Sequence, residues 1–423
     1  MQSSDSMRAQ IRTLIVATSV IQLAIGFFTT FISLRVAAAN FNTTLAGLIL
    51  SSYFAGFTWG ALRCARIIER VGHIRAYSAF AGSAIAATAA MPILTGPVSW
   101  MILRAIVGFG CAGVFVTTES WLNVKAQPRE RGRVFSTYMV GNFVALAVGQ
   151  LLIARIEIQG SKPFHAIEAL FALALIMVST TRAEPPVVTA TDKLPYGELA
   201  RAAPIAVIGC VVNGLLASSF YALVPAWMHD RGVDRKTIAL LMLMAVFGGL
   251  VFQVPVGRLS DRFDRRIVLV ALGLGLAATA ITVIFLPRSL PPLVAPAALL
   301  GGFISTLYPV CVAIANDCMP ADRVLAVSGR LLLISGLGSV VGPLTGTSIM
   351  ARSGISGLFY FMAVAAGLLA LVAAVSCLVM AAPRHRLRTF KILAPHATSL
   401  AHDPLGSPTD IPPNSIGAIS AER

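Results

Sequence analysis

Charged side chains are scarce in this sequence. Only 12% of its 423 residues are Asp, Glu, Lys or Arg, whereas 57% are hydrophobic, and the mean hydropathy is +0.81. An average soluble domain carries about 25% charged residues, so a water-exposed surface of ordinary extent is excluded. Most of the chain is therefore expected to lie within a lipid bilayer.

Acidic residues are the scarcer charges: 18 Asp and Glu stand against 33 Lys and Arg, a net charge of +15. The basic residues lie in short loops between apolar stretches instead of along one soluble face, which argues against a nucleic-acid partner. Lys and Arg are retained on the cytoplasmic side of membrane proteins. We therefore expect a multi-pass protein of the bacterial inner membrane with both termini in the cytoplasm.

Reactive and metal-binding patterns are also missing. The six cysteines form no CxxC pair or His/Cys cluster, so neither a metal nor a cofactor is expected. No nucleophile with a base and no phosphate loop is found, which argues against an enzyme. The glycines at 108, 110 and 113 spell GxGxxG, but no strand precedes them, so they predict close helix packing instead of dinucleotide binding.

Long apolar stretches are what the sequence has instead. They predict an all-α integral membrane protein of twelve spans in two six-helix halves. The half boundaries are 1–181 and 203–381, separated by a cytoplasmic linker at 182–202 and followed by a disordered cytoplasmic tail at 382–423. The expected spans are 14–36, 45–65, 76–94, 98–122, 134–153, 164–180, 204–227, 238–256, 267–286, 293–316, 331–350 and 355–380.

An internal repeat supports the two halves. Glu69 aligns with Asp261 at an offset of 192 residues (261 − 69), and Gly56 aligns with Gly248 at the same offset (248 − 56). Parallel repeats of this kind form transporters whose substrate site lies between the halves near the membrane midplane.

Residues 257–266 read GRLSDRFDRR, which resembles the signature loop of the major facilitator superfamily. The resemblance implies an inner gate made of Gly257, Asp261, Arg262, Arg265 and Arg266. The glycine would allow close helix packing, and the charged residues would meet a helix end or carboxylates. A loop that only sets topology is the alternative, but it explains neither the glycine nor the acidic residues.

The copy in the first half departs from this pattern, because residues 65–75 read ARIIERVGHIR. Its gate positions are Glu69, Arg70, Gly72 and Arg75. The family resemblance pairs such a loop with a carboxylate on the fourth span, where Glu119 is the candidate. A Glu69, Arg75 and Glu119 cluster is thus a hypothesis.

The fourth span contains Arg104 followed by closely spaced glycines, which resembles a second motif of the same family. The resemblance links this arginine to proton coupling, and Glu119 is the second coupling candidate. A buried arginine is costly and normally faces a cavity or partner; snorkelling to the outer interface is the alternative. The second half carries Pro296 at the position that corresponds to Arg104 by the 192-residue offset.

The stretches ESWLN from Glu119 and RGRVFSTYM from Arg131 resemble the YcaD-like subgroup of bacterial permeases. The resemblance implies a monomeric secondary transporter of a small organic solute that works by alternating access in the lipid bilayer, with proton symport. A solute sensor or a membrane assembly factor with the same fold is the alternative, which the intact gate motif argues against.

In this family the first, fourth, seventh and tenth spans line the central path. Their polar and aromatic residues near mid-depth are the candidates for a solute site, although packing or lipid contact is the alternative for each aromatic. An apolar cavity with few polar groups suits an organic solute better than an ion. The candidates are Gln22, Phe28, Asn213, Tyr221, Tyr308 and Asn316, with Thr29, Ser218 and Ser305 beside them.

Overall fold

The computed structural model describes residues 2–39, 41–127, 130–155, 157–180, 195–287, 290–320 and 323–379. The expected tail at 382–423 and the first part of the expected linker, 182–194, lie outside these ranges. The last part of that linker forms a short helix, α7 (Tyr196–Ala202).

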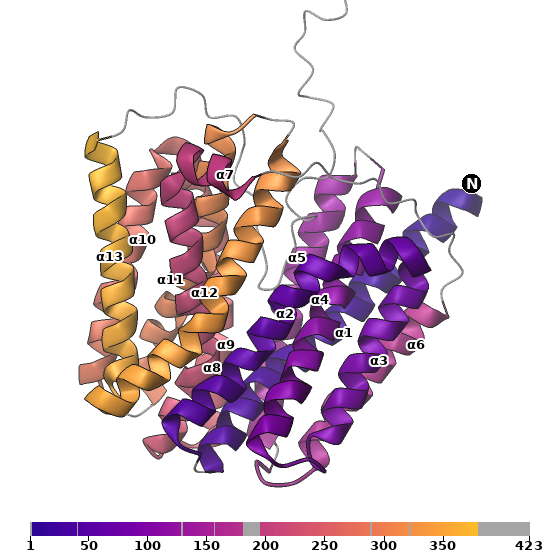
Figure 1. Ribbon diagram of the computed structural model, residues 1–423, viewed down its shortest axis with the longest axis horizontal. Helices are drawn as coiled ribbons and strands as arrows, with labels where there is room; N and C mark the ends of the chain where they lie inside the picture. The colour runs from indigo at the N-terminus through magenta and orange to yellow at the C-terminus, as the bar shows by residue number, and fades with distance from the viewer. Residues whose placement is uncertain are drawn as a thin grey trace, which may run out of the picture.

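Two groups of six long helices make up the described residues, as the sequence predicts. The first group lies on one side of the molecule and the second on the other (Figure 1). The first group is α1 (Gln2–Ala38), α2 (Thr43–Val71), α3 (His73–Ala90), α4 (Pro97–Lys125), α5 (Arg131–Leu152) and α6 (Lys162–Ser179), with a 3-10 turn, η1, at Ile153–Arg155. The second group is α8 (Pro204–Asp230), α9 (Arg235–Arg262), α10 (Arg265–Phe285), α11 (Leu290–Cys318), α12 (Val324–Ser353) and α13 (Gly357–Val379).

Eleven of the helices in the described ranges are long and apolar enough to cross a membrane. The remaining long helix, α3, has 18 residues, and its content of Ala, Ser and Gly together with two charged or polar residues in its first turn lowers its hydropathy. It packs against α4 and α6, as a sixth member of the first bundle. The predicted all-α membrane fold is therefore confirmed.

Side-chain caps fix where several helices begin. The Asn42 side chain accepts a hydrogen bond from the Leu45 amide at 2.8 Å, and Asp234 accepts one from the Thr237 amide at 3.1 Å. Such caps satisfy backbone donors that the first helical turn leaves unpaired. The hydrogen bonds from Thr237 also hold the pKa of the Asp234 carboxyl below its usual value. Asn42 and Asp234 therefore mark the starts of α2 and α9.

Close helix contacts repeat in the two halves. A Cβ atom added at Gly56 of α2 would lie 1.9 Å from the Ala105 carbonyl oxygen of α4, and one added at Gly248 of α9 would lie 2.0 Å from the Ala298 carbonyl oxygen of α11. Only glycine permits backbones to approach so closely. The predicted repeat is thus present in the packing as well as in the sequence.

Replacing Gly248 by alanine is expected to lower the stability of the second half. The added methyl group meets backbone, which cannot move aside as a side chain can, and overpacking of this kind costs about 1–3 kcal/mol. Gly82→Ala in α3 is the matched control, because a Cβ atom there meets nothing within 4 Å. Thermal unfolding of the purified variants in detergent measures both, and equal midpoints for the two variants would contradict this account.

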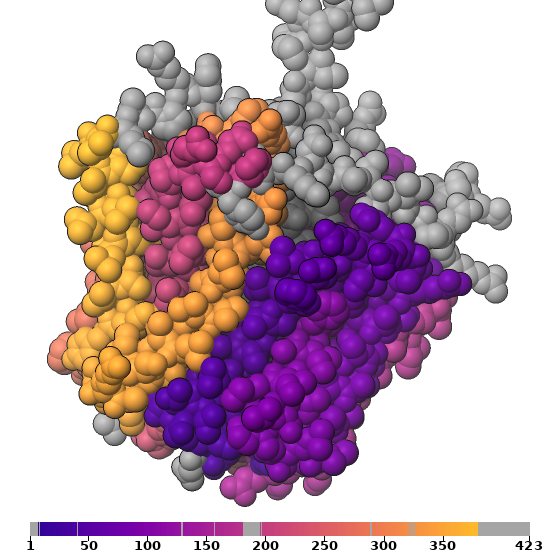
Figure 2. Space-filling view, viewed as in Figure 1, coloured from indigo at the N-terminus to yellow at the C-terminus, as the bar shows by residue number. Residues whose placement is uncertain are grey.

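The two halves touch mainly at one end of the molecule. Ser33, near the end of α1, donates a hydrogen bond to the Ala222 carbonyl of α8 at 2.6 Å and accepts one from the Ala226 amide at 3.1 Å. Gly47, near the start of α2, lies against Thr347 near the end of α12. Figure 2 shows α2 and α12 side by side in the lower part of the view, and Figure 1 shows them leaning apart toward the end that carries the N-terminus.

Candidate functional site

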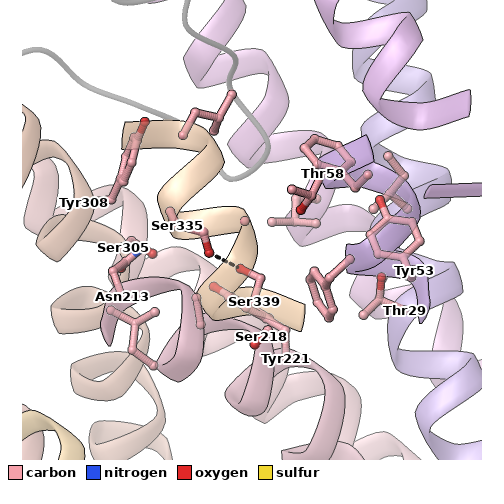
Figure 3. Close-up of a pocket in the computed structure, with 18 of the residues that line it drawn as sticks. Thr29, Tyr53, Thr58, Asn213, Ser218, Tyr221, Ser305, Tyr308, Ser335 and Ser339 are labelled. Atoms are coloured by element: carbon pink, nitrogen blue, oxygen red, sulfur yellow. Dashed lines mark hydrogen bonds between the residues drawn. The ribbon is translucent and has the colours of Figure 1, made fainter. Parts of the chain in front are cut away.

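A cavity with a volume of about 180 Å³ lies between the two halves. It is large enough for a small organic molecule, and both halves contribute to its wall (Figure 3). Residues from α1, α2 and α5 line one side and residues from α8, α11 and α12 line the other. The lining residues are Ile25, Gly26, Thr29, Thr30, Tyr53, Phe54, Phe57, Thr58, Ala61, Leu146, Gln150, Asn213, Ala217, Ser218, Tyr221, Ile304, Ser305, Tyr308, Pro309, Leu332, Leu333, Ser335, Gly336 and Ser339.

The first half contributes an aromatic face from α2. Tyr53, Phe54 and Phe57 lie within about one turn of each other, and the Tyr53 and Phe54 rings meet edge to face with centroids 5.4 Å apart. Thr58 stands next to them with its hydroxyl buried and without a hydrogen-bond partner in the structure. Aromatic faces with one hydroxyl group suit a flat or partly apolar ligand.

The second half contributes most of the polar groups. Asn213 of α8 is 8% exposed, and its Oδ1 atom has no hydrogen-bond partner. Tyr221, two turns further along α8, and Ser305 of α11 also line the cavity, and both hydroxyl groups are buried without a hydrogen-bond partner. Figure 3 shows Asn213, Ser305 and Tyr308 across the cavity from Tyr53 and Thr58. A buried amide oxygen without a partner is costly, so Asn213 is suited to accept a hydrogen bond from a bound solute.

Three of the six main candidates from the sequence line this cavity: Asn213, Tyr221 and Tyr308. Thr29, Ser218 and Ser305 line it as well. Gln22, Phe28 and Asn316 do not, which corrects their expected place. All three side chains are buried in the protein interior, away from the cavity.

The helices that line the cavity also differ from expectation. No residue of α4 contributes, whereas α2, α5 and α12 do. Helices α2 and α4 pack closely at Gly56 and Gly108, and of the two only α2 contributes residues to the cavity wall. The wall between the halves is therefore built in part by helices that the family resemblance did not single out.

Arg104 of α4 is 1% exposed, so it does not snorkel to the surface. Its Nε atom donates to the Ile49 carbonyl of α2 at 2.8 Å, and its guanidinium carbon lies 5.5 Å from the Phe28 ring centroid and 5.7 Å from that of Tyr53. Arg104 thus connects α4 to α1 and to the cavity residue Tyr53. The shared packing pairs Ala105 with Ala298, so the position that corresponds to Arg104 is 297, one residue beyond the expected Pro296.

The gate sequence of the second half forms ion pairs at the turn between α9 and α10. Arg265, 4% exposed, lies with its Nη2 atom 3.6 Å from Asp261 Oδ1 and with its Nε atom 3.3 Å from Asp317 Oδ2, at the end of α11. Gly257 is buried in α9, whereas the Arg262 side chain is exposed. Arg265 therefore ties the turn to a neighbouring helix.

Arg266 makes a second connection at the same turn. It pairs with Asp264, with an Nη2 to Oδ2 distance of 2.8 Å, and its Nη1 atom donates to the Ser376 carbonyl of α13 at 2.9 Å. Arginine suits this role because its planar fork of donors serves two partners at once. The turn is thus fixed to both α11 and α13.

Removing Asp317 is expected to destabilise this turn strongly. Asp317→Ala removes the nearer of the two carboxylates described at the buried Arg265, which costs about 3 kcal/mol or more. The exposed pair of Arg323 and Glu198, whose side chains are 44% and 45% exposed, is the control, and Glu198→Ala should cost about 1 kcal/mol or less. Thermal unfolding measures the loss of stability in the two variants. A smaller loss for Asp317→Ala than for Glu198→Ala would contradict a stabilising role of Asp317 at this turn.

The corresponding turn of the first half is different. Gly72 has a positive φ of 82° between α2 and α3, a backbone conformation that favours glycine. Glu69, Arg70 and Arg75 are exposed, and none of the ion pairs in the described ranges joins them to Glu119. Glu119 is fully buried. The hypothetical cluster is therefore not formed in this structure.

Glu119 instead accepts a hydrogen bond from the Tyr138 hydroxyl of α5, with an Oη to Oε1 distance of 3.1 Å. Tyr138 is not among the site residues expected from the sequence. It lies in the stretch from Arg131 that resembles the YcaD-like permeases, and nothing in its spacing from Glu119 indicates contact between the two residues.

Comparison with known proteins agrees with this architecture. A model of the Major Facilitator Superfamily matches residues 14–225 and again residues 206–405. The solved structure of the nucleoside transporter NupG is similar with a TM-score of 0.73 and 10% identity, covering 86% of this chain and 98% of that one. A bacterial homolog of the human lysosomal transporter Spinster, in an inward-facing and occupied conformation, has a TM-score of 0.71 and 16% identity, covering 87% of this chain and 97% of its own.

Two curated relatives are uncharacterized MFS-type transporters called YcaD. The one from Shigella flexneri serotype 5b (strain 8401) is 29% identical over 349 residues, which cover 81% of this chain and 89% of the relative. The one from Escherichia coli (strain SE11) is 29% identical over 348 residues, which cover 80% and 88%. Because the family model matches both six-helix halves, this chain belongs to the major facilitator superfamily of membrane transporters and is similar to its YcaD-like members.

Proposed function

We propose that the protein is a secondary active transporter that carries a small organic solute by alternating access, as a monomeric proton symporter of the bacterial inner membrane. The observation that carries this proposal is the cavity between the halves. Both halves build its wall, so a rocking motion of one half against the other changes the access to a bound solute without moving the site.

The lining of the cavity favours an uncharged solute. Among the lining residues that the structure describes there is no Asp, Glu, Lys, Arg or His. An ion would have to leave water without gaining a partner of opposite charge, which is costly. The aromatic face of α2 and the Asn213 amide together favour a neutral solute with a flat apolar part and at least one hydrogen-bond donor.

The direction of opening follows from the proposed topology. With both termini in the cytoplasm, the end at which Figure 1 shows the halves leaning apart is the cytoplasmic end. The contacts of Ser33 with Ala222 and of Gly47 with Thr347 then close the opposite, outer side. The structure would accordingly represent an inward-facing arrangement.

A ligand screen followed by a flux measurement tests the proposal. Thermal shift with a panel of neutral sugars, nucleosides and aromatic compounds should identify a binder, because a ligand of the folded state raises the unfolding midpoint by mass action. The binder should then enter proteoliposomes in a saturable manner, and faster with an imposed pH gradient. Absence of flux for every binder, with folded protein in the vesicles, would contradict transport.

Asn213→Ala should weaken binding of the identified solute by about 2- to 10-fold, the loss that corresponds to one neutral hydrogen bond. Asn316→Ala is the matched control. Both asparagines are 8% exposed and have an unpartnered Oδ1 atom, but only Asn213 lines the cavity. Thermal-shift titration gives the dissociation constants of both variants. An equal loss of affinity in the two variants would contradict a direct contact between Asn213 and the solute.

A further inference from the structure

A chain of buried polar groups lies inside the first half, apart from the cavity lining. The Tyr138 hydroxyl of α5 donates a hydrogen bond to Glu119 Oε1 of α4 at 3.1 Å, and Asn142 lies one turn beyond Tyr138 on α5. Glu119 and Tyr138 are 0% exposed and Asn142 is 1% exposed. A carboxyl group and a phenol are thus hydrogen-bonded between α4 and α5, with a buried amide one helical turn away.

Helix α1 adds two more residues, Thr18 and Gln22, to these buried polar groups. Together with Glu119, Tyr138 and Asn142 they form what we call the polar layer. Thr18 donates a hydrogen bond to Thr118, the residue before Glu119, at 3.0 Å. Gln22, one turn further along α1, is 0% exposed, and neither its Oε1 nor its Nε2 atom has a hydrogen-bond partner. The Oδ1 atom of Asn142 is also unpartnered.

The polar layer lies next to the cavity. Gly26 and Leu146 line the cavity and touch each other, since a Cβ atom at Gly26 would lie 2.7 Å from the Leu146 carbonyl oxygen. Gln22 and Asn142 precede these two residues by four positions each (26 − 22 and 146 − 142). In an α-helix four positions are about one turn on the same face, so the layer lies about one turn from the cavity.

The unpartnered amides indicate what occupies the layer. Buried polar atoms without partners are rare, and an ordered water molecule commonly satisfies them. Gln22 offers both N–H donors and a carbonyl acceptor, which suits a water molecule better than a metal cation, because the N–H groups repel a cation. Water between Gln22 and Asn142 would give a protonic connection from the cavity to Glu119.

Other buried polar groups lie in the same part of the first half as the carboxyl group. Tyr138 of α5 donates a hydrogen bond to it, and Tyr77 of α3 is likewise fully buried. His73 of α3 contacts Ser120, the next residue of α4, at 3.1 Å. The carboxyl group thus lies in the buried interior of the first half, close to other polar groups.

We propose that Glu119 is the proton-binding site of this transporter, that Tyr138 is its positioning residue, and that water held by Gln22 and Asn142 links it to the cavity. The inference rests on the proposed proton-coupled transport. In the binding step a hydronium ion gives its proton to a Glu119 carboxylate oxygen, which leaves a neutral carboxylic acid and one water molecule. Release is the reverse reaction, and no electron transfer or covalent bond between heavy atoms is involved.

Infrared difference spectroscopy of the full-length protein in lipid tests the site with the proton alone as the probe. Acidifying the buffer should produce the carbonyl band of a protonated, buried carboxylic acid. Glu119→Gln should abolish that band. Glu168→Gln is the matched control, because Glu168 also lies in a membrane helix but is partly exposed and paired with His165 at 3.4 Å. Persistence of the band in Glu119→Gln overturns the proposal.

Tyr138→Phe keeps the carboxyl group and removes only its donor. The carboxylate then loses a hydrogen bond to a charged group, worth about one to two pH units, so the midpoint of the infrared band should move to higher pH by that amount. An unchanged midpoint overturns the positioning role. This variant also serves as the test if Glu119→Gln does not fold.

Solute flux separates this inference from the proposed function. Gradient-driven flux that survives in Glu119→Gln overturns the proton site and leaves transport in place. Solute exchange without a pH gradient that survives in Glu119→Gln, while gradient-driven accumulation is lost, supports both.

Discussion

Cysteines in place of Gly47 and Thr347 are expected to form a disulfide that stops transport until it is reduced. Gly47 belongs to α2 of the first half and Thr347 to α12 of the second. A Cβ atom built at Gly47 lies 3.3 Å from Thr347 Cβ, close to the separation of about 3.5–4.5 Å that disulfides require. The two positions lie at the end where the halves already touch.

Alternating access is the reason for the expected arrest. If the halves rock about the central site, this contact must open once in every cycle. A covalent bond across it prevents the opening, so uptake of the identified solute should fall to the level of empty vesicles under oxidising conditions. A reducing agent should restore it.

A disulfide within one half is the control for the chemistry. A Cβ atom at Gly209 of α8 would lie 3.7 Å from Cys311 Cβ of α11, so Gly209→Cys can pair with this native cysteine without bridging the halves. Transport should then continue after oxidation. Full transport by the Gly47→Cys, Thr347→Cys variant, with the disulfide verified by mass spectrometry, would show that this contact does not open.

The sequence predicts the fold well because hydropathy and the repeat are strong signals. Membrane spans need long apolar stretches, and the 192-residue offset between Gly56 and Gly248 reflects a packing constraint that both halves share. Each of these glycines meets a carbonyl oxygen of a neighbouring helix. A glycine that is required by such a backbone contact is therefore a reliable sequence signal for the fold.

The wall of the cavity could be predicted only in part, because the depth at which the cavity ends depends on packing between distant residues. Thr29 and Gln22 lie two turns apart on one face of α1, yet Thr29 lines the cavity and Gln22 is buried one turn beyond it. The contact of Glu119 with Tyr138 joins two helices in the same way. Neither arrangement could be predicted from the spacing of these residues along the chain.

Arg104→Gln is expected to reduce transport by on the order of tenfold or more while leaving thermal stability nearly unchanged. Arg104 is fully buried, and its Nη1 atom has no hydrogen-bond partner. Replacing a buried charge by a neutral polar side chain is often neutral or stabilising, because the desolvation cost disappears. If Arg104 served only stability, its replacement would lower the unfolding midpoint of the protein.

The loss of transport follows from what Arg104 holds together. Its hydrogen bond to the Ile49 carbonyl and its position beside the Phe28 and Tyr53 rings join α4, α1 and the aromatic wall of the cavity. Glutamine is too short to reach all of them, so Tyr53 loses a fixed orientation toward the solute. Arg63→Gln is the control, because Arg63 is exposed and also lies against an aromatic ring, 4.8 Å from the Trp59 centroid. Flux in proteoliposomes and thermal unfolding measure both variants, and a large fall in stability for Arg104→Gln with a parallel loss of flux would make the residue structural.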